Sequence, residues 1–361
     1  MKILALGATG AIGTQMVNTM KGQDHELHVT TRRDRSSGDG VIYHQGNARN
    51  PAFLATLLKD RWDAIVDFMV YDTPEFKDRV EPLLASTDQY IFFSSARVFA
   101  NSETPLKECS PRLLDTTTDS DFLASDEYAL AKARQEDALR ATGRSNWTIV
   151  RPYITFGNGR LQLGTLEKED WLFRALQGRT IVFCEDLLKR ITTLTDGADV
   201  AAMLSALIGR DDALGEDFNL VGSDTMTWDD VLSLYVREIE QKYGQKPRIH
   251  LQTLNAFSDA APSKPQVIYD RNYNRRFETS KIEKFLEPKP AGESLRLLSR
   301  RMRSQLDSGN FLDIDAKQEA LRDKITSEFS PMSNFASPKQ KLRYSIHRFL
   351  PQNTIERLRR H

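Results

Sequence analysis

The sequence predicts an α/β fold: a doubly wound parallel sheet, a smaller α/β domain and a helical C-terminal extension. Two observations lead to this prediction. Short apolar, β-rich runs alternate with amphipathic stretches through the first half of the chain, and the first run, Lys2–Leu6, leads into a glycine-rich turn. Near-continuous apolar strands separated by helices are typical of a parallel sheet that is covered by helices on both faces.

The individual elements follow from this alternation. The runs expected to be strands are Lys2–Leu6, Leu27–Thr31, Val41–Gln45, Ala64–Asp67, Gln89–Ser94 and Asn146–Val150. The stretches expected to be helices between them are Ile12–Met20, Pro51–Leu58, Glu75–Leu84 and Tyr128–Leu139. Later helices are expected at Gly197–Gly209 and Met226–Gly244, the second with Thr227 as its N-cap. Ligands of such sheets bind beyond the carboxyl ends of the strands, so the residues after each strand are the informative ones.

Composition narrows the class of protein. The 361 residues include 50 basic and 50 acidic side chains, so the zero net charge gives no global reason to expect a nucleic-acid partner. Cys109 and Cys184 form no CxxC pattern, and no cluster has metal-ligand spacing, so neither disulfides nor a metal is expected. No apolar run is long enough to span a bilayer, and the N-terminus enters a strand without room for a signal peptide. We therefore expect a cytoplasmic protein.

The turn after the first strand has the sequence GATGAIG, with Gly7, Gly10 and Gly13 spaced three apart. Glycines allow a tight turn and a close backbone approach to a pyrophosphate, whose charge then faces the N-terminus of the following helix. Directly after an N-terminal strand, this pattern indicates a Rossmann-type dinucleotide site rather than a structural turn. The expected cofactor contacts in this turn are Gly7, Thr9, Gly10, Ala11, Ile12 and Gly13.

The end of the second strand suggests which dinucleotide is bound. An acidic residue at this place would bind the ribose hydroxyls of NAD, but Thr31 stands there, followed by Arg32 and Arg33. Arginines suit a 2′-phosphate, so NADP(H) is favoured over NAD(H). The alternative is that both arginines are solvated loop charges, and the neighbouring Asp34 keeps NAD(H) open.

Two further features are ambiguous when taken singly. Ser94 and Ser95 end the fifth strand, where a hydroxyl can face a ligand or merely satisfy the strand end. Tyr128 and Lys132 are spaced i, i+4 on one face of a helix. This spacing suits a catalytic acid/base pair, but it also occurs among ordinary helix residues.

Together and in this order, the glycine turn, the strand-end serine and Tyr-x-x-x-Lys resemble the extended short-chain dehydrogenase/reductase family of nucleotide-sugar epimerases, dehydratases and reductases. The resemblance covers roughly Met1 to Phe285. Its further local matches are WTIVRPYITFGNG, TDGADVAAML and DFNLVGSDTMTWDDVL. It implies that Tyr128 is the general acid/base, that Lys132 binds the nicotinamide ribose and favours the phenolate, and that Ser95 rather than Ser94 is the catalytic hydroxyl.

The resemblance implies more contacts and also shows departures. Asn47 and Phe68 would join Tyr128 and Lys132 at the cofactor, and the substrate contacts would be Ser95, Arg97 and Arg190. Family dehydratases carry an Asp-Glu pair after the hydroxyl residue, but this chain has Ala96 and Arg97. Elimination is therefore not expected, and the hydride transfer favoured is that of a keto-sugar reductase.

The remaining alternatives concern reaction, partners and domains. An epimerase with tightly bound NAD stays open, as does a non-catalytic Rossmann sensor or RNA-binding protein. We expect a nucleotide-sugar substrate, a homodimer, a cofactor domain at 1–155 completed by elements around 190–222, and a substrate-binding region at 156–330. The segment 331–361 is a basic helical tail, with Glu356 as its only acid from Pro338 onward. The tail could contact an anionic membrane, bind a partner or form a packed helix pair.

Overall fold

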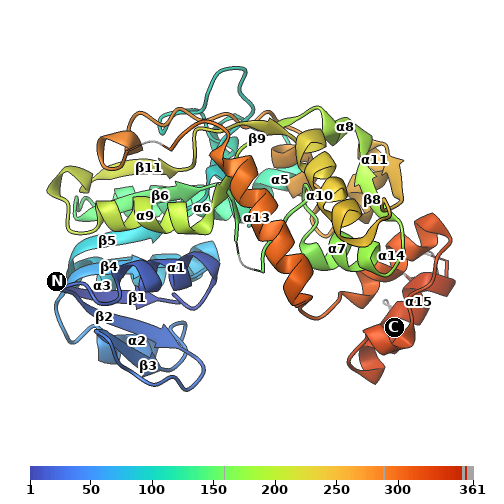
Figure 1. Ribbon diagram of the computed structural model, residues 1–361. Helices are drawn as coiled ribbons and strands as arrows, with labels where there is room; N and C mark the ends of the chain where they lie inside the picture. The colour runs from blue at the N-terminus through green and yellow to red at the C-terminus, as the bar shows by residue number, and fades with distance from the viewer. Residues whose placement is uncertain (158, 288, 352–353, 356–361) are drawn as a thin grey trace. The chain divides into compact units, whose positions relative to one another are not determined.

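The computed structural model describes residues 1–157, 159–287, 289–351 and 354–355, which divide into two compact units (Figure 1). The first unit comprises Met1–Gly157, Thr193–Thr225 and Arg275–Ser294. The second comprises the described residues within Asn158–Thr192, Met226–Asn274 and Leu295–His361. That 156–330 binds substrate stays a prediction.

The first unit is built on a seven-stranded sheet with the order β11-β6-β5-β4-β1-β2-β3, in which every neighbouring pair is parallel. The strands are β1 (Lys2–Leu6), β2 (Glu26–Thr31), β3 (Val41–Gln45), β4 (Trp62–Asp67), β5 (Thr87–Phe93), β6 (Trp147–Pro152) and β11 (Glu216–Leu220). A short parallel pair, β7 (Ile154–Phe156) with β10 (Leu194–Asp196), follows β6. The predicted Rossmann-type fold class is confirmed.

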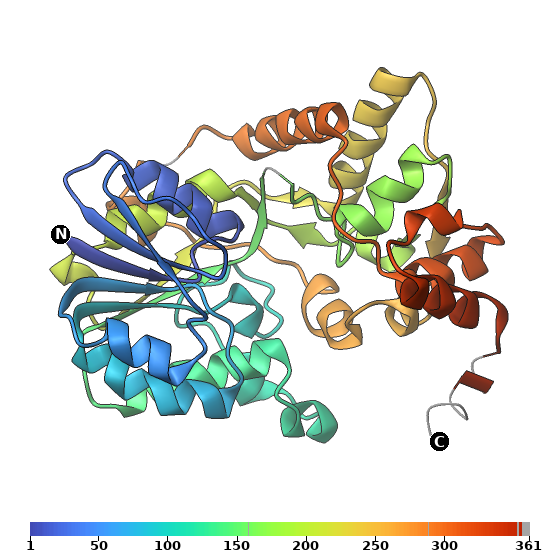
Figure 2. The ribbon, with the colours of Figure 1, turned by 90° about the horizontal axis from the view of Figure 1, so that it is seen from below.

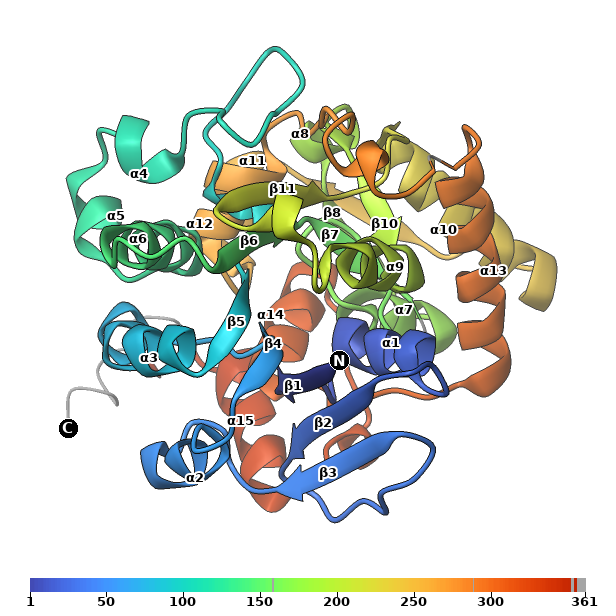
Figure 3. The same ribbon diagram turned by 90° about the vertical axis from the view of Figure 1, so that its left-hand side faces the viewer.

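Helices cover both faces of this sheet (Figure 3). One face carries α1 (Ala11–Met20) and α9 (Gly197–Leu207), and the other carries α2 (Pro51–Leu57), α3 (Thr73–Ala85) and α6 (Tyr128–Ala141). Along β1, Ile3 and Ala5 belong to one apolar cluster, whereas Leu4 belongs to the cluster of the opposite face. This alternation explains why a central strand such as β1 is apolar along most of its length, because both of its faces are buried.

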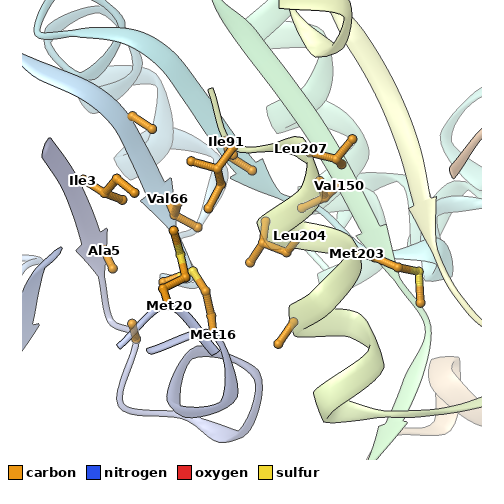
Figure 4. Packing of buried hydrophobic residues seen from close by; sticks show 14 of the residues in the cluster. Ile3, Ala5, Met16, Met20, Val66, Ile91, Val150, Met203, Leu204 and Leu207 are labelled. Atoms are coloured by element: carbon orange, nitrogen blue, oxygen red, sulfur yellow. The ribbon is translucent and has the colours of Figure 1, made fainter. Parts of the chain in front are cut away.

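The core beneath α1 and α9 is drawn in Figure 4. Met16 and Leu204 bring the two helices against Ile91 and Val150 of the sheet, and all four side chains are fully buried. The core therefore fixes the N-terminus of α1 and the carboxyl ends of the central strands, which are the places where the predicted site residues lie.

The second unit combines short strand pairs with helices. Its main elements are α7 (Lys168–Leu176), β8 (Ile181–Cys184), α8 (Glu185–Leu188), β9 (Ile191–Thr192), β12 (Met226–Thr227), α10 (Trp228–Tyr243), β13 (Ile249–Gln252), α11 (Leu254–Ala260), most of α13 (Glu293–Ser308), α14 (Ala316–Thr326) and α15 (Pro338–Phe349). Thr227 caps α10 as expected, and Gly244 ends the helix with a left-handed backbone at φ +73°.

The C-terminal helices pack onto the second unit through buried charges as well as apolar contacts. Arg174 of α7 pairs with Glu319 at 2.9 Å and with Asp323 at 2.7 Å, and all three side chains are fully buried. α14 in turn packs against α15, as Figure 2 shows. Within the described part of the predicted tail, 331–351 and 354–355, the chain forms a 3₁₀ turn at Met332–Asn334 and then α15, which packs on α14.

Candidate functional site

The glycine turn between β1 and α1 uses its three glycines in different ways. Gly7 adopts a left-handed backbone at φ +72°, and its N–H donates to Thr30 Oγ1 at 2.9 Å. A Cβ on Gly13 would lie 2.4 Å from Ala8 Cα, so this glycine allows the helix to pack closely on the turn. A Cβ on Gly10 would meet no protein atom within 4 Å, so this position faces open space.

The N-terminus of α1 is suited to an anion. Gly10 is the N-cap and has no side chain that could accept from the first amides of the ten-residue helix. Thr9, Gly10 and Ala11 are exposed, and Ile12 is partly exposed. Free amides and the positive end of the helix dipole thus meet beside an open glycine, and these residues fit the pyrophosphate of a dinucleotide.

Cationic side chains follow β2. Arg32 and Arg33 are exposed, and neither forms an ion pair with any residue that the structure describes. Thr31 is buried, and its hydroxyl donates to the backbone carbonyl of Arg33 at 3.0 Å. The predicted 2′-phosphate contacts are therefore accessible and are not occupied by neighbouring acids.

The other predicted cofactor contacts lie after β3 and β4. Asn47 is exposed and its side chain accepts from the amide of Arg49. Phe68 is partly buried against Phe93, with the ring centroids 4.3 Å apart. Both follow the carboxyl end of a strand, as does the glycine turn after β1.

Both serines after β5 are buried, but their hydroxyls have different partners. Ser94 is buried and donates to Glu136 Oε1 at 2.5 Å, so its hydroxyl is held inside the protein. Ser95 caps a short 3₁₀ turn, where its Oγ accepts from the amide of Arg97 at 3.3 Å. The proton of Ser95 is not committed by that contact, which leaves Ser95 the better donor to a ligand.

Tyr128 and Lys132 lie at the start of α6. Tyr128 is the first residue of the helix and is partly exposed, whereas Lys132 is 2% exposed. Lys132 Nζ donates to the carbonyl of Phe93 at 2.7 Å, directly before the two serines. An ammonium has three N–H donors, so this bond leaves others for a ligand. The bond brings the lysine of α6 to the end of β5.

Arg97 connects the serine to the tyrosine. Its guanidinium lies 5.0 Å from the ring centroid of Tyr128 and donates to Glu127 Oε1 at 2.6 Å. Glu127 also caps α6 by accepting from the amide of Ala129 at 2.7 Å. The structure thus brings Ser95, Arg97, Tyr128 and Lys132 together, and it places Arg97 against the phenol, which the sequence does not reveal.

A buried ion network behind this group was not predicted. Glu136 is fully buried and accepts from Arg151 through both carboxylate oxygens, at 2.7 and 2.8 Å. Arg151 continues to Asp217 at 2.7 Å. Burial by itself would raise the pKa of Glu136, but the charge of Arg151 and the hydrogen bonds from Arg151 and Ser94 hold that pKa below its usual range. The sequence signal that could have indicated this network is the position of Glu136, one helical turn after Lys132.

Asp67, at the end of β4, is a second buried carboxylate near the lysine. It accepts from the Tyr90 hydroxyl at 2.9 Å, the Tyr71 hydroxyl at 3.3 Å and the Met69 amide at 3.0 Å. Burial raises its pKa in spite of these donors. Burial also lowers the pKa of Lys132 to about 8, although the charges of Asp67 and Glu136 oppose that shift.

The remaining predicted substrate residue, Arg190, lies in the second unit, where its Nε donates to Asn272 Oδ1 at 3.0 Å. In the first unit, Arg275 is fully buried and donates to the carbonyls of Phe99 and Ala100, both at 3.0 Å. Arg275 is therefore part of the interior. Among the described residues, no group of three or more His, Cys, Asp or Glu side chains could hold a metal ion.

Comparison with known proteins agrees with this fold. Residues 3–82 match the model of the NAD dependent epimerase/dehydratase family. UDP-glucuronic acid 4-epimerase from Bacillus cereus, solved with UDP-glucuronic acid and NAD, aligns with a TM-score of 0.61 at 15% identity, over 84% of this chain and 99% of the epimerase. Pal from Bacillus thuringiensis aligns with a TM-score of 0.64 at 17% identity, over 86% of this chain and all of Pal.

One curated protein also matches this chain in sequence. Chloroplast stem-loop binding protein of 41 kDa b from Arabidopsis thaliana is 24% identical over 247 residues, which cover 63% of this chain and 60% of the relative. The match thus spans less than two thirds of that protein.

The fold and the glycine turn place this chain among Rossmann-type proteins, and residues 3–82 are similar to the NAD dependent epimerase/dehydratase family. The predicted resemblance to the extended short-chain dehydrogenase/reductase family is confirmed by the family match over residues 3–82 and by the fold of the solved neighbours. The prediction of an enzyme of this type agrees with the family match over residues 3–82. No helix in the described part of the chain is long and apolar enough to cross a membrane.

Proposed function

We propose that this protein is an NAD(P)-dependent oxidoreductase that transfers a hydride between nicotinamide and a carbon of a nucleotide sugar. The observation that carries the proposal is the hydrogen bond from Lys132 Nζ to Phe93 O, which joins the Tyr-x-x-x-Lys helix to the serine-bearing end of β5. An uncapped helix N-terminus beside an open glycine supplies the matching place for a dinucleotide.

Each residue of the group has a role in this proposal. Ser95 donates a hydrogen bond to the reacting oxygen of the sugar, and Tyr128 gives a proton to that oxygen or takes one from it. Lys132 holds the nicotinamide ribose, and Arg97 places positive charge against the phenol ring. The bound cofactor would supply the hydride, and Ala96 and Arg97 offer no carboxylate for an elimination.

The preferred cofactor in this proposal is NADP(H), because Arg32 and Arg33 are exposed and pair with no acid in the described part of the chain, while Thr31 replaces the acidic residue of NAD sites. The Bacillus cereus neighbour, by its title, binds NAD. Calorimetric titration with NADPH and NADH tests the preference. We expect NADPH to bind at least about tenfold more tightly, and Arg32→Ser/Arg33→Ser to remove that difference. Failure to bind either cofactor would contradict the proposed function as a whole.

Within this proposal we favour a keto-sugar reductase, which releases its oxidised cofactor, and the solved neighbour makes an epimerase the second candidate. The two reactions differ in net redox change. With UDP- and dTDP-linked keto-sugars, a reductase consumes one NADPH for each product, which absorbance at the nicotinamide band measures. An epimerase interconverts UDP-sugars without net consumption of cofactor. Denaturation of the purified epimerase would release a nicotinamide cofactor in an amount stoichiometric with the protein.

The Arabidopsis relative, named as a stem-loop binding protein, supports RNA binding as a candidate from another class. A zero net charge speaks against it. Filter binding with a stem-loop RNA at low and physiological salt separates the candidates, because binding through phosphates weakens steeply with salt. Tight, salt-dependent RNA binding without any cofactor binding would favour the RNA-binding candidate.

The proposed homodimer is tested by light scattering, and a cytoplasmic location by fractionation.

A further inference from the structure

Helix α15 has a well-anchored inner face. Tyr344 is 1% exposed, and its hydroxyl donates to Asp323 Oδ2 at 2.6 Å while it accepts from the amide of Ser330 at 2.9 Å. Phe335 packs on the Tyr344 ring at 4.8 Å, and the helix begins with a capping box at Ser337. The helix is therefore held in one orientation, so the residues of its other face are fixed too.

The outer face of α15 is apolar. Leu342 and Phe349 are 63% and 59% exposed, and they are spaced i, i+7 with the partly exposed Ile346 between them. Phe329, which follows α14, is 60% exposed and stacks on Phe349 with the ring centroids 6.0 Å apart. Four large apolar side chains thus form one stripe toward solvent, an arrangement that is costly unless something covers it.

Cations flank this apolar stripe on both sides. Lys339 and Arg343 lie on one side of the helix, and Lys341 and Arg348 lie on the other. Lys339, Lys341 and Arg343 are exposed and pair with no acid among the residues that the structure describes, and α15 itself contains no acidic residue. Arg348 stacks over Phe329 at 4.3 Å. Asp323, which accepts from Tyr344, is buried on the inner side. Glu328, whose backbone carbonyl accepts from Arg348, is partly buried, and its carboxylate pairs with Arg174 and Arg248.

We propose that α15 binds an anionic lipid bilayer, with Leu342, Ile346, Phe349 and Phe329 in the interface and the flanking lysines and arginines on the lipid headgroups. An apolar stripe between rows of cations matches the layered chemistry of a bilayer surface, where acyl chains lie beneath anionic headgroups. A nucleic acid offers phosphates but no apolar phase, so it would leave the stripe exposed. This proposal is independent of the reaction proposed above.

The test is sedimentation of the full chain with vesicles of phosphatidylcholine alone or mixed with phosphatidylglycerol. We expect binding to the mixed vesicles only, and weaker binding at high salt. Leu342→Ser/Phe349→Ser should weaken binding at least about tenfold. Lys339→Gln/Lys341→Gln should weaken it about 25-fold, at about fivefold for each lysine. Because all four side chains are exposed, the variants should keep the wild-type circular dichroism and melting temperature.

Matched controls make the outcome specific. Leu312 is 77% exposed in another part of the second unit, and Lys59 and Lys77 are exposed on the first. Leu312→Ser and Lys59→Gln/Lys77→Gln should bind vesicles like the wild type. Equal binding to both kinds of vesicle, no binding, or equal losses in the control variants would each overturn the proposal. Binding of a stem-loop RNA that is lost in the α15 variants, without vesicle binding, would overturn it in favour of a nucleic-acid surface.

Discussion

The N-termini of α1 and α6 differ in how much of each site the protein completes itself. α1 starts on Gly10, which has no capping side chain and faces open space. α6 starts after Glu127, which caps the helix and binds Arg97, and its next turns bury Lys132 and Glu136 among charges of the same unit. At the N-terminus of α1 the amides remain available to a ligand. At the N-terminus of α6 the charged side chains are already paired within the protein, around the partly exposed Tyr128. Binding and chemistry are thus supported by different physical means.

The largest expected effect is on turnover, from a substitution of Tyr128 at the N-terminus of α6. Tyr128→Phe keeps the ring on the Arg97 guanidinium but removes the hydroxyl that we propose moves the proton. We expect kcat to fall by about 10² to 10⁴-fold with the cofactor Kd unchanged, as single-turnover kinetics and calorimetry would measure. The exposed Tyr243 provides the control, because Tyr243→Phe should be silent. Normal turnover of the Tyr128 variant would refute the assigned role.

The second prediction concerns how much the buried ion network behind α6 contributes to stability. Glu136→Gln removes the carboxylate that Arg151 and Ser94 share, which leaves a buried guanidinium only partly neutralised by Asp217. We expect the free energy of unfolding in urea to fall by about 3 kcal/mol. Glu81→Gln, which breaks an exposed pair with Arg144 at 3.2 Å, should change it by less than about 1 kcal/mol. Equal effects would mean that burial of the network contributes nothing.

The buried lysine should make stability depend on pH. The pKa of Lys132 is lowered to about 8 in the fold from an ordinary 10.5, so between these values the unfolded chain binds more protons than the native one. The free energy of unfolding should therefore rise with pH across that window, by on the order of 2 kcal/mol from this group. Urea titrations of the wild type and of Lys132→Met at about pH 7 and pH 10 isolate the contribution. An identical pH dependence in both proteins would exclude it.

The smallest expected change in stability is at Gly10, the N-cap of α1. Gly10→Ala places a methyl group in open space, so we expect a loss of stability below about 1 kcal/mol. The same methyl group occupies the approach of a pyrophosphate, so cofactor affinity should fall at least about tenfold. Gly13→Ala should instead destabilise the fold by about 1 to 3 kcal/mol, because its Cβ meets the backbone of Ala8. Unchanged cofactor affinity in the Gly10 variant would place the ligand elsewhere.

The sequence by itself was sufficient for the first six strands of the sheet, the glycine turn and the order of the chemical motifs. Lys2–Leu6 begins and ends where the apolar run predicts, because a strand that is buried on both faces requires apolar residues throughout. Val41–Gln45 also has its predicted bounds, although it is an edge strand in which only Val41 is buried. The choice of Ser95 over Ser94 came from the family resemblance and stays a prediction, and in the structure the Ser94 hydroxyl donates to Glu136.

Only the tertiary structure decided what surrounds those motifs. Arg97 against Tyr128, Arg151 on Glu136 and the buried Lys132 all depend on residues that come from different elements, and no local pattern encodes such distances. The same holds for α15, because the sequence gives its composition, but only packing of Tyr344 inward turns Leu342 and Phe349 toward solvent. Periodicity fixes which residues share a face of an element, whereas long-range packing fixes what that face meets.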